Sequence, residues 1–551
     1  MTATDRIRPH RARLTALRDE TTRHLSAAVH VDGDLADAMI REFLVEPLRA
    51  IAPSPGVDAF AVLREAVAAR ARRMLRDWCL LIVLIAFFAT SLTWGLIWLA
   101  VAYASAALGS PSSGWRHRGV HRVVAIALVP LALVVVTILF AVRAVSAYVQ
   151  GTAAFLEFFT TPAVGPWTVA LGGSALAILV GNEFLLAQLF ARSFRRGLFE
   201  ARPNRYSWPG ERWARNFNVD AYRDQLARIE QSDSTANLVV YRGYEPFVGA
   251  GTRVEKSAIS LAVSLEPDDD SIAEPFTLAD LYDHVSTRML ELRDAASLAP
   301  SERLGGLAER VQVIVPIQEL FTNAADPATK DVLPGLDRRP AERIGEDRLA
   351  GLVEQPLEWM RYYRCYQLET WDRGLTVSAY LTFGMSERTL FLEWTPCLLF
   401  PLDRGYRTVD STSIEPLSAL GSAALSWIRL PVALLSRLRS LFTWLRPMPD
   451  QPGMVFPDRY AASASLRELA AADELDNYFQ VSDVSRYLQV LSTRMTSAVG
   501  EFLADRGISV TDFMEQAKTV INQTTVMGNM VNSVIGNRNT VAGNRATHSD
   551  Q

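Results

Sequence analysis

The sequence is poor in the side chains on which most metal and acid–base chemistry depends. Among 551 residues there are 7 histidines and 3 cysteines, and only His284 lies between residues 236 and 519. Histidine and cysteine are the usual ligands of zinc, and histidine is the usual base of a nucleophilic triad. We therefore predict no metal, no cofactor and no catalytic residue, and we favour a protein that is not an enzyme.

The three cysteines, Cys79, Cys365 and Cys397, do not make a disulfide framework. We interpret them as small buried hydrophobic residues in a reducing compartment. The formal net charge of −4 gives no general attraction to nucleic acid. A soluble basic face studded with aromatic residues is also lacking, so no nucleic-acid partner is predicted.

One segment, residues 249–257, superficially suggests a phosphate-binding loop. It fails the required spacing because no glycine precedes Lys256. We interpret the glycines that follow Pro246 as residues that shape a hairpin connection between two strands.

Long uncharged runs are abundant between residues 78 and 190. Residues 78–115 and 123–142 carry no charge, and residues 167–190 carry one, Glu183. Each run is long enough for the ~20 residues of a membrane-spanning helix. We predict three transmembrane helices, at about 78–108, 123–148 and 167–190, in a bacterial plasma membrane. Residues 1–30 are charged and lack the apolar core of a cleavable signal peptide.

Two topologies remain open. With three simple spans, one side carries the arginines at 64, 70, 72, 73, 76 and 143, and the other carries those at 116, 118, 122, 192, 195, 196, 202 and 205. With six arginines on one side and eight on the other, the positive-inside rule does not decide which side is cytoplasmic. If the first run instead doubles back near residues 90–95 as a re-entrant or short hairpin, only the loop 143–157 lies opposite the basic clusters. Half of the first run is short for a complete span. Both topologies allow a cytoplasmic C-terminal region.

Asn182 and Glu183 are polar neighbours within the third run. Ionisable groups inside a bilayer are costly and often functional, so this pair is a candidate intramembrane polar site for a cation or a neighbouring helix. The alternative, which we favour, is that Glu183 lies within two turns of the cytoplasmic end and reaches toward the interface.

Composition and periodicity divide the rest of the chain. The parts are a helical cytoplasmic unit at 1–77, a basic linker at 191–235, an α+β domain at 236–410, a basic amphipathic region at 411–449, a helical region at 450–519 and a polar tail at 520–551. The predicted fold class is a membrane protein with an N-terminal helical unit and a C-terminal α+β domain that contains an antiparallel sheet.

The α+β prediction depends on alternating residues. Residues 259–265 alternate between apolar and small side chains, as in a half-buried strand, and residues 311–315 mark another strand. A helix near 276–293 is expected to pack on the sheet, and another is expected at 482–505. The clearest pattern is a three-strand meander at 361–371, 375–383 and 389–400, with turns at 372–374 and 384–387.

Residues 416–449 contain no acidic residue but several arginines. From Leu434 onward, leucines and Phe442 cluster on one helical face. A basic helix with a wide apolar stripe and Trp444 fits a helix that lies in a membrane interface. The alternative is an amphipathic helix packed into a core. Pro431 argues against one continuous span.

The last 32 residues repeat a V-x-G-N unit. The repeated residues are Val526, Gly528, Asn529, Val534, Gly536, Asn537, Val541, Gly543 and Asn544. Valines that alternate with Gly-Asn turns suit short β-arches, and stacked asparagines form ladders. The repeat loosely resembles the tails of bacterial proteins that assemble by amyloid-like or β-solenoid stacking. The alternative is a disordered polar tail.

Three segments, at 54–58, 243–251 and 476–480, resemble those of a group of actinobacterial integral membrane proteins without an assigned activity. The most specific is Gly-Tyr-Glu-Pro-Phe-Val-Gly-Ala-Gly at 243–251. The resemblance implies a shared architecture and offers no catalytic residues. The second segment supplies a candidate ligand loop that lines a pocket, made of Tyr244, Pro246, Phe247, Gly249 and Gly251.

We favour a membrane-anchored scaffold or sensor that self-assembles through its tail. Its expected partners are membrane lipids, a second copy of itself or a cytoplasmic protein. The alternatives are a ligand-responsive membrane regulator that uses the loop at 244–251, and a small transporter subunit that uses Glu183.

Overall fold

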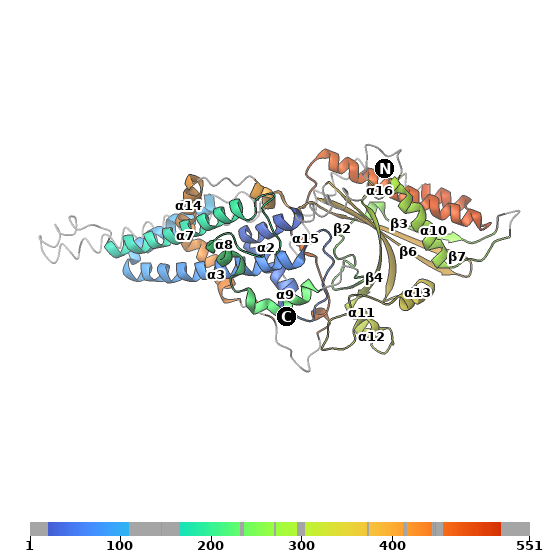
Figure 1. Ribbon diagram of the computed structural model, residues 1–551, viewed down its shortest axis with the longest axis horizontal. Coiled ribbons are helices and arrows are strands. Elements are labelled where there is room, and N and C mark those ends of the chain that lie inside the picture. Colours follow the sequence, from blue (N-terminus) through green and yellow to red (C-terminus); the bar gives the residue numbers. More distant parts are fainter. Residues whose placement is uncertain are drawn as a thin grey trace. The chain divides into compact units, whose positions relative to one another are not determined.

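The computed structural model describes residues 20–108, 145, 165–231, 236–268, 272–294, 304–371, 374–410, 416–443, 445, 447 and 456–518. The chain forms two compact units (Figure 1). We call Met1–Ala66, Asp220–Thr408 and Arg446–Gln551 the sheet unit, and Val67–Val219 and Val409–Leu445 the helical unit. The expected span at 123–148, apart from Val145, and the V-x-G-N tail lie outside the described residues.

Seven strands in the described residues form one sheet in the order β1-β4-β5-β6-β7-β2, and β3 also pairs with β7. The strands are β1 (Leu238–Tyr241), β2 (Thr252–Arg253), β3 (Ile259–Ser264), β4 (Leu307–Pro316), β5 (Arg361–Thr370), β6 (Leu375–Ser386) and β7 (Thr389–Leu399). The pair β1–β4 is parallel, whereas the other pairs are antiparallel. The α+β prediction is confirmed, with the correction that the sheet is mixed.

The predicted meander is present as β5, β6 and β7. Its second turn is shorter than the predicted 384–387, because Ser386 pairs with Thr389 and leaves Glu387 and Arg388 as the turn. The alternation of β3 is also confirmed, since its apolar residues are buried and the residues between them are exposed.

The two long helices predicted for the sheet unit, α10 (Leu278–Leu290) and α16 (Tyr478–Asp505), lie on one face of the sheet (Figure 1). Thr277 and Asp280 form a capping box at the start of α10, which satisfies backbone amides that the first turn leaves unpaired. Tyr282 of α10 reaches the sheet, where its hydroxyl accepts a hydrogen bond from the amide of Phe383 at 2.8 Å. Shorter helices complete the unit: α2 (Gly33–Ile40), α9 (Arg223–Glu230), α11 (Ile317–Thr322), α12 (Thr329–Val332), α13 (Glu346–Glu354) and α15 (Leu466–Leu469).

Residues before Ala66 belong to the sheet unit rather than forming a separate domain. The carboxylate of Glu42 accepts a hydrogen bond from Arg242 at 2.8 Å, and Glu46 accepts one from Arg459 at 2.7 Å. Both glutamates are buried. The hydrogen bonds therefore tie the N-terminal segment to two distant parts of the chain.

The connection from β1 to β2, residues 242–251, crosses the sheet, and we call it the crossing loop. The predicted hairpin is wrong, because β1 and β2 do not pair and are separated by five interstrand steps. At ~4.8 Å per step this is about 24 Å, which ten extended residues with a reach of about 33 Å can cover.

The helical unit consists of α4 (Leu92–Leu108), α7 (Pro166–Arg192), α8 (Pro209–Asn216), α14 (Pro416–Phe442) and most of α3 (Ala59–Thr90). Helix α14 continues through Pro431. One of its faces packs into a core, as in the alternative weighed for this region. The core residues are Leu80, Leu84, Phe87, Trp98, Ala175, Leu179, Ala423, Leu430 and Leu434.

The chain bends sharply at Ser91, between α3 and α4. The rings of Phe87 and Trp98 are 5.1 Å apart, whereas eleven residues of straight helix rise about 16 Å. The hydroxyls of Ser91 and Thr168 are in contact, so the end of α3 meets the start of α7 and the two helices run antiparallel. The bend lies within residues 90–95, where the hairpin topology places its turn.

Among the described residues, α7 is the one helix whose length and composition suit a membrane crossing. The helix α4 is apolar but shorter.

Gly251 and Gly243 give a matched test of the crossing loop. Both have positive φ, at 85° and 90°. A Cβ at Gly251 would lie 2.3 Å from the carbonyl oxygen of Leu398, whereas none of the neighbours of Gly243 lies within 4 Å. We expect Gly243→Ala to lower the free energy of unfolding by about 1 kcal/mol, from backbone strain alone. Gly251→Ala adds a backbone clash and should cost about 3 kcal/mol or more.

The measurement is urea unfolding of the purified full-length protein in detergent, followed by tryptophan fluorescence. Equal losses for the two variants would contradict the close approach of the crossing loop to β7.

Candidate functional site

The inner half of the crossing loop is packed into the protein. Phe247 is buried, and its ring lies 4.3 Å from that of Tyr380 and 5.5 Å from that of Tyr363. These tyrosines belong to neighbouring strands, on the face of the sheet opposite to α10 and α16. Phe247 is therefore a packing residue at the middle of the sheet.

Gly249 and Gly251 direct their backbone amides at one carboxylate. The two N–H groups donate to Oε1 of Glu468 at 2.9 and 2.8 Å, and the amide of Ser465 donates to Oε2 at 2.7 Å. Backbone amides that converge in this way form a nest for an anion. Here the anion is a carboxylate of the protein itself, 217 residues away from Gly251 in the chain.

Glu468 is half-buried in this nest. Burial raises the pKa of its carboxyl above the ordinary value of 4.5, although the hydrogen bonds from the three amides act in the opposite direction. The same carboxylate closes a capping box with Ser465 at the start of α15. One side chain therefore completes a helix end and fixes the crossing loop.

Arg467, beside Glu468, attaches α15 to the sheet. Its guanidinium is buried and donates to the hydroxyl of Thr376 in β6 at 3.0 Å. The face of β6 on which Thr376 lies is buried as well, so this strand is covered on both sides. Two consecutive residues of α15 thus bind two different parts: Arg467 binds the sheet, and Glu468 binds the crossing loop.

Cys365 and Cys397 lie beneath Phe247 and are buried, as predicted. Burial raises the pKa of the Cys365 thiol to about 12, and that of Cys397 well above its ordinary value. Because the thiolate is the nucleophilic form, these cysteines act as hydrophobic packing. The prediction is wrong for Cys79, which is exposed on α3.

The outer half of the crossing loop is open to solvent. Tyr244 is 81% exposed, and the guanidinium of Arg253 lies 5.2 Å from its ring centre. The Nε of Arg253 also donates to Glu245 at 3.0 Å. Pro246 is half-buried between the two halves of the loop. Of the five residues predicted for a ligand loop, Tyr244 is the one whose side chain is largely exposed.

Asn182 and Glu183 lie on α7 and are half-buried. Ser91 and Thr168 are in contact, so they mark the same level on the two antiparallel helices α3 and α7. Glu183 comes 15 residues after Thr168, and Arg76 comes 15 residues before Ser91, so Glu183 and Arg76 also lie at a common level. Arg76 donates to Asp77 at 2.7 Å. Glu183 therefore lies at the same end of the helical unit as Arg76 and Asp77.

Two further expectations concern metals and assembly. In the part of the chain that the structure describes, no group of three or more potential metal ligands comes together. The assembly residues of the V-x-G-N tail lie outside that part.

Sequence reasoning missed Ser465 and Glu468. The pattern Ser-Leu-Arg-Glu at 465–468 has the spacing of a capping box, so it signals the start of a helix. Nothing in that pattern indicates that the carboxylate also binds a loop more than two hundred residues earlier.

Replacing Glu468 tests the nest directly. Glu468→Ala leaves three part-buried amides without their acceptor, and each costs about 1–3 kcal/mol. We expect the free energy of unfolding to fall by about 3 kcal/mol or more, measured by urea unfolding in detergent. Glu474→Ala is the control, because this exposed glutamate lies nearby in sequence and its loss should change stability by less than about 0.5 kcal/mol. A small effect of Glu468→Ala would remove the nest from the account of the fold.

Comparison with known proteins gives one result. The profile of a family described as an AbeC-like domain matches residues 258–537, which are 280 of the 551 residues. The match begins just before β3, so β1, the crossing loop and the N-terminal segment precede it. No curated protein matches the chain, and no solved structure matches it. The chain belongs to the AbeC-like domain family.

Proposed function

We propose that the protein is a non-enzymatic scaffold or sensor that its helical unit anchors in the bacterial plasma membrane. The supporting observation is the way the chain is divided. The sheet unit is assembled from three stretches, and helical segments, Val67–Val219 and Val409–Leu445, interrupt it twice. The chain thus leaves a compact domain through apolar helices and returns to it each time.

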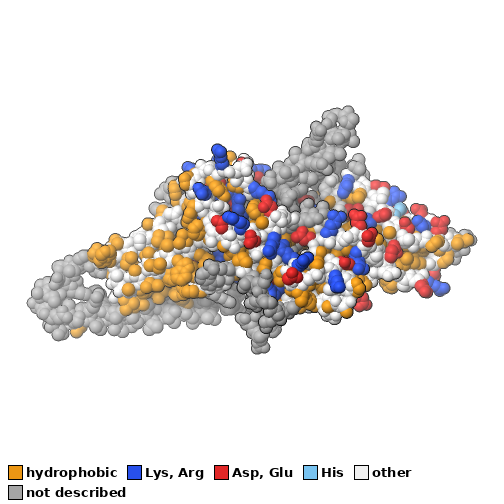
Figure 2. Space-filling view, turned by 60° about the horizontal axis from the view of Figure 1, so that its bottom comes forward, with side chains coloured by type: hydrophobic (Ala, Val, Ile, Leu, Met, Phe, Trp, Pro, Cys, Tyr) orange, Lys and Arg blue, Asp and Glu red, His pale blue; other side chains and the backbone are white. Residues whose placement is uncertain are grey.

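The helical unit exposes apolar side chains to an extent that is unusual for a soluble surface. On α3, Ile82 is 64% and Ile85 is 61% exposed. Val169 and Phe184 on α7 and Leu435 on α14 are exposed as well. Figure 2 shows hydrophobic side chains gathered over the helical unit, at left, and more charged side chains at right. A lipid environment would cover these side chains.

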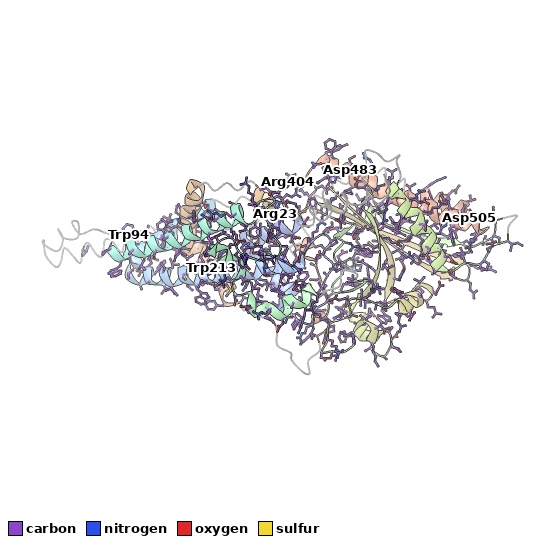
Figure 3. All side chains as sticks on the ribbon, viewed as in Figure 1. Arg23, Trp94, Trp213, Arg404, Asp483 and Asp505 are labelled. Atoms are coloured by element: carbon purple, nitrogen blue, oxygen red, sulfur yellow. The ribbon has the colours of Figure 1, made fainter. Side chains whose placement is uncertain are left out.

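Tryptophans lie toward both ends of the helical unit. Trp167, at the start of α7, is exposed, and Trp94 lies toward the same end (Figure 3). Trp78 and Trp213 are exposed toward the other end, near Arg76 and the end of α7. Tryptophans at two levels with apolar side chains between them are typical of a membrane-embedded unit.

The sheet unit limits the number of membrane crossings. Residues on either side of Val67–Val219 belong to this one unit, as the bond between Glu42 and Arg242 illustrates. A compact domain occupies one side of a membrane, so the intervening chain makes an even number of crossings. This supports the hairpin topology, in which α3 and α4 form a re-entrant pair, over three simple spans.

The same reasoning applies to α14. The chain on both sides of Val409–Leu445 belongs to the sheet unit. A helix of 27 residues is about 40 Å long, enough to cross a ~30 Å hydrocarbon layer once but not to return. We therefore propose that α14 enters the membrane interface without spanning it, packed on α4 and α7.

A scaffold needs a surface for its partner, and α16 offers one. Tyr478 and Phe479, at its start, are both largely exposed, and their rings lie 6.0 Å apart. Exposed neighbouring aromatic residues are frequent anchors of protein interfaces. We propose that they bind a cytoplasmic protein, and that the tail at 520–551 supports self-assembly. The resemblance to actinobacterial membrane proteins supports a bacterial host.

A ligand-responsive regulator is a second candidate, and the exposed outer half of the crossing loop favours it. Tyr244 and Arg253 present a stacked aromatic and cationic pair to solvent. The inner half of the crossing loop already packs through Phe247 and binds Glu468, so any ligand would bind at the outer half. Glu183 lies at the same level as Arg76, and this position gives the transporter hypothesis no further support.

The topology is tested by labelling single cysteines with a membrane-impermeant maleimide. Cys79 is replaced by serine, whereas the buried Cys365 and Cys397 can stay. Asp34→Cys and Arg196→Cys, made singly at exposed positions, should react from the same side of the membrane. Labelling from opposite sides would contradict the even number of crossings. Release of the protein from membranes by alkaline carbonate would contradict anchoring itself.

The scaffold proposal is tested by crosslinking in cells and purification of the tagged full-length protein. We expect a stoichiometric partner that Tyr478→Ala combined with Phe479→Ala removes, while the protein stays in the membrane. Tyr244→Ala is the matched control, since it removes an equally exposed aromatic residue from another surface. If Tyr244→Ala loses the partner and the double variant keeps it, the result would favour the ligand-loop candidate instead.

A further inference from the structure

The last residue of α7 and the chain that follows it form a compact basic segment, residues 192–213, which we call the basic collar. Its exposed arginines are Arg192, Arg195, Arg196, Arg202, Arg205 and Arg212. Among the described residues of this segment, Glu200 is the one exposed carboxylate. The collar therefore presents a strongly positive surface, although the whole chain has a net charge of −4.

A buried ion pair gives the collar a defined structure. Arg215 is 1% exposed and lies over the ring of Phe194 at 5.2 Å. It donates to the carboxylate of Glu211 at 3.0 Å and to the carbonyl oxygen of Glu200 at 3.1 Å. Glu211 also accepts hydrogen bonds from the amide and the hydroxyl of Ser207 at 2.8 and 2.6 Å. The exposed arginines thus extend from a folded turn.

Contacts within the segment also explain why the charge of the collar's surface is positive. The carboxylate of Glu211 is engaged by Arg215 and Ser207, so it does not neutralise the exposed arginines. Leu198 and Trp213 are 57% and 40% exposed between these arginines. Figure 3 labels Trp213 on α8. Basic, aromatic and aliphatic side chains in one segment are the combination found where proteins meet a bilayer surface.

The position of the collar supports the same partner. It follows the last turn of α7, at the end of the helical unit where Glu183 and Arg76 lie. A helix that crosses the hydrocarbon layer delivers the residues after it to the headgroup region. We propose that the basic collar binds the headgroups of anionic phospholipids, with Leu198 and Trp213 inserted beside the upper acyl chains. This inference depends on the proposed membrane anchoring.

The test uses the full-length protein reconstituted in nanodiscs that contain phosphatidylcholine and phosphatidylglycerol. After delipidating washes, mass spectrometry measures the ratio of the two lipids that stay with the protein. The variant combines Arg195→Gln, Arg205→Gln and Arg212→Gln. Because one arginine near an anionic surface favours it about fivefold, we expect the enrichment of phosphatidylglycerol to fall at least fivefold.

Two matched variants control for charge and folding. Arg338→Gln, Arg343→Gln and Arg388→Gln remove the same charge from exposed positions of the sheet unit and should leave the enrichment unchanged. Arg195→Lys, Arg205→Lys and Arg212→Lys together keep the charge and should keep the enrichment. Unchanged enrichment in the glutamine variant of the collar, or an equal loss in the sheet-unit variant, would overturn the proposal.

The outcomes separate this inference from the proposed function. Release of the protein by alkaline carbonate overturns membrane anchoring and the collar together. Retention in the membrane with unchanged lipid enrichment overturns the collar alone. A soluble acidic protein that is lost from the collar variant while the lipid ratio stays constant would assign the surface to that protein.

Discussion

The sheet unit depends on a contact between one half-buried carboxylate and the backbone of a distant loop. Glu468 accepts the amides of Gly249 and Gly251, and these glycines place the crossing loop against the N-terminal segment on one side and β7 on the other. A buried polar group costs free energy unless it is paired, so the carboxylate and the amides each require the other. Phe247, Arg467 and the capping box of α15 take their positions around this contact.

The parts that sequence reasoning predicted are those with strong local signals. The meander from β5 to β7 and the helices α10 and α16 were predicted because alternation and helical periodicity are local properties. The crossing of the sheet by residues 242–251 was not predicted, because glycines on either side of Pro246 signal a turn without indicating which strands it joins. The same limit applies to Glu468, whose local pattern indicates a helix cap and whose second role depends on tertiary structure.

The candidate ligand loop illustrates how one motif combines two roles. Its most specific residues, Phe247, Gly249 and Gly251, are needed because the backbone passes close to other segments and because a ring fills the space over the sheet. Tyr244 has no comparable structural duty and is exposed. Only part of a distinctive sequence motif is therefore available for binding, because its other residues are required for packing. In the helical unit, the sharp bend at Ser91 likewise separates two helices that composition presents as one apolar run.

The distance along the chain between Gly251 and Glu468 has a consequence for biosynthesis. The two residues are 217 positions apart, and ribosomes add about 5–20 residues per second, so the carboxylate emerges about 10–40 s after the loop that needs it. Once β7 ends at Leu399 the strands are complete, but the second face of β6 has no cover until α15 is synthesised. The nascent domain therefore carries an exposed sheet face while α14 is being synthesised, and release of a truncated chain leaves that face open to aggregation.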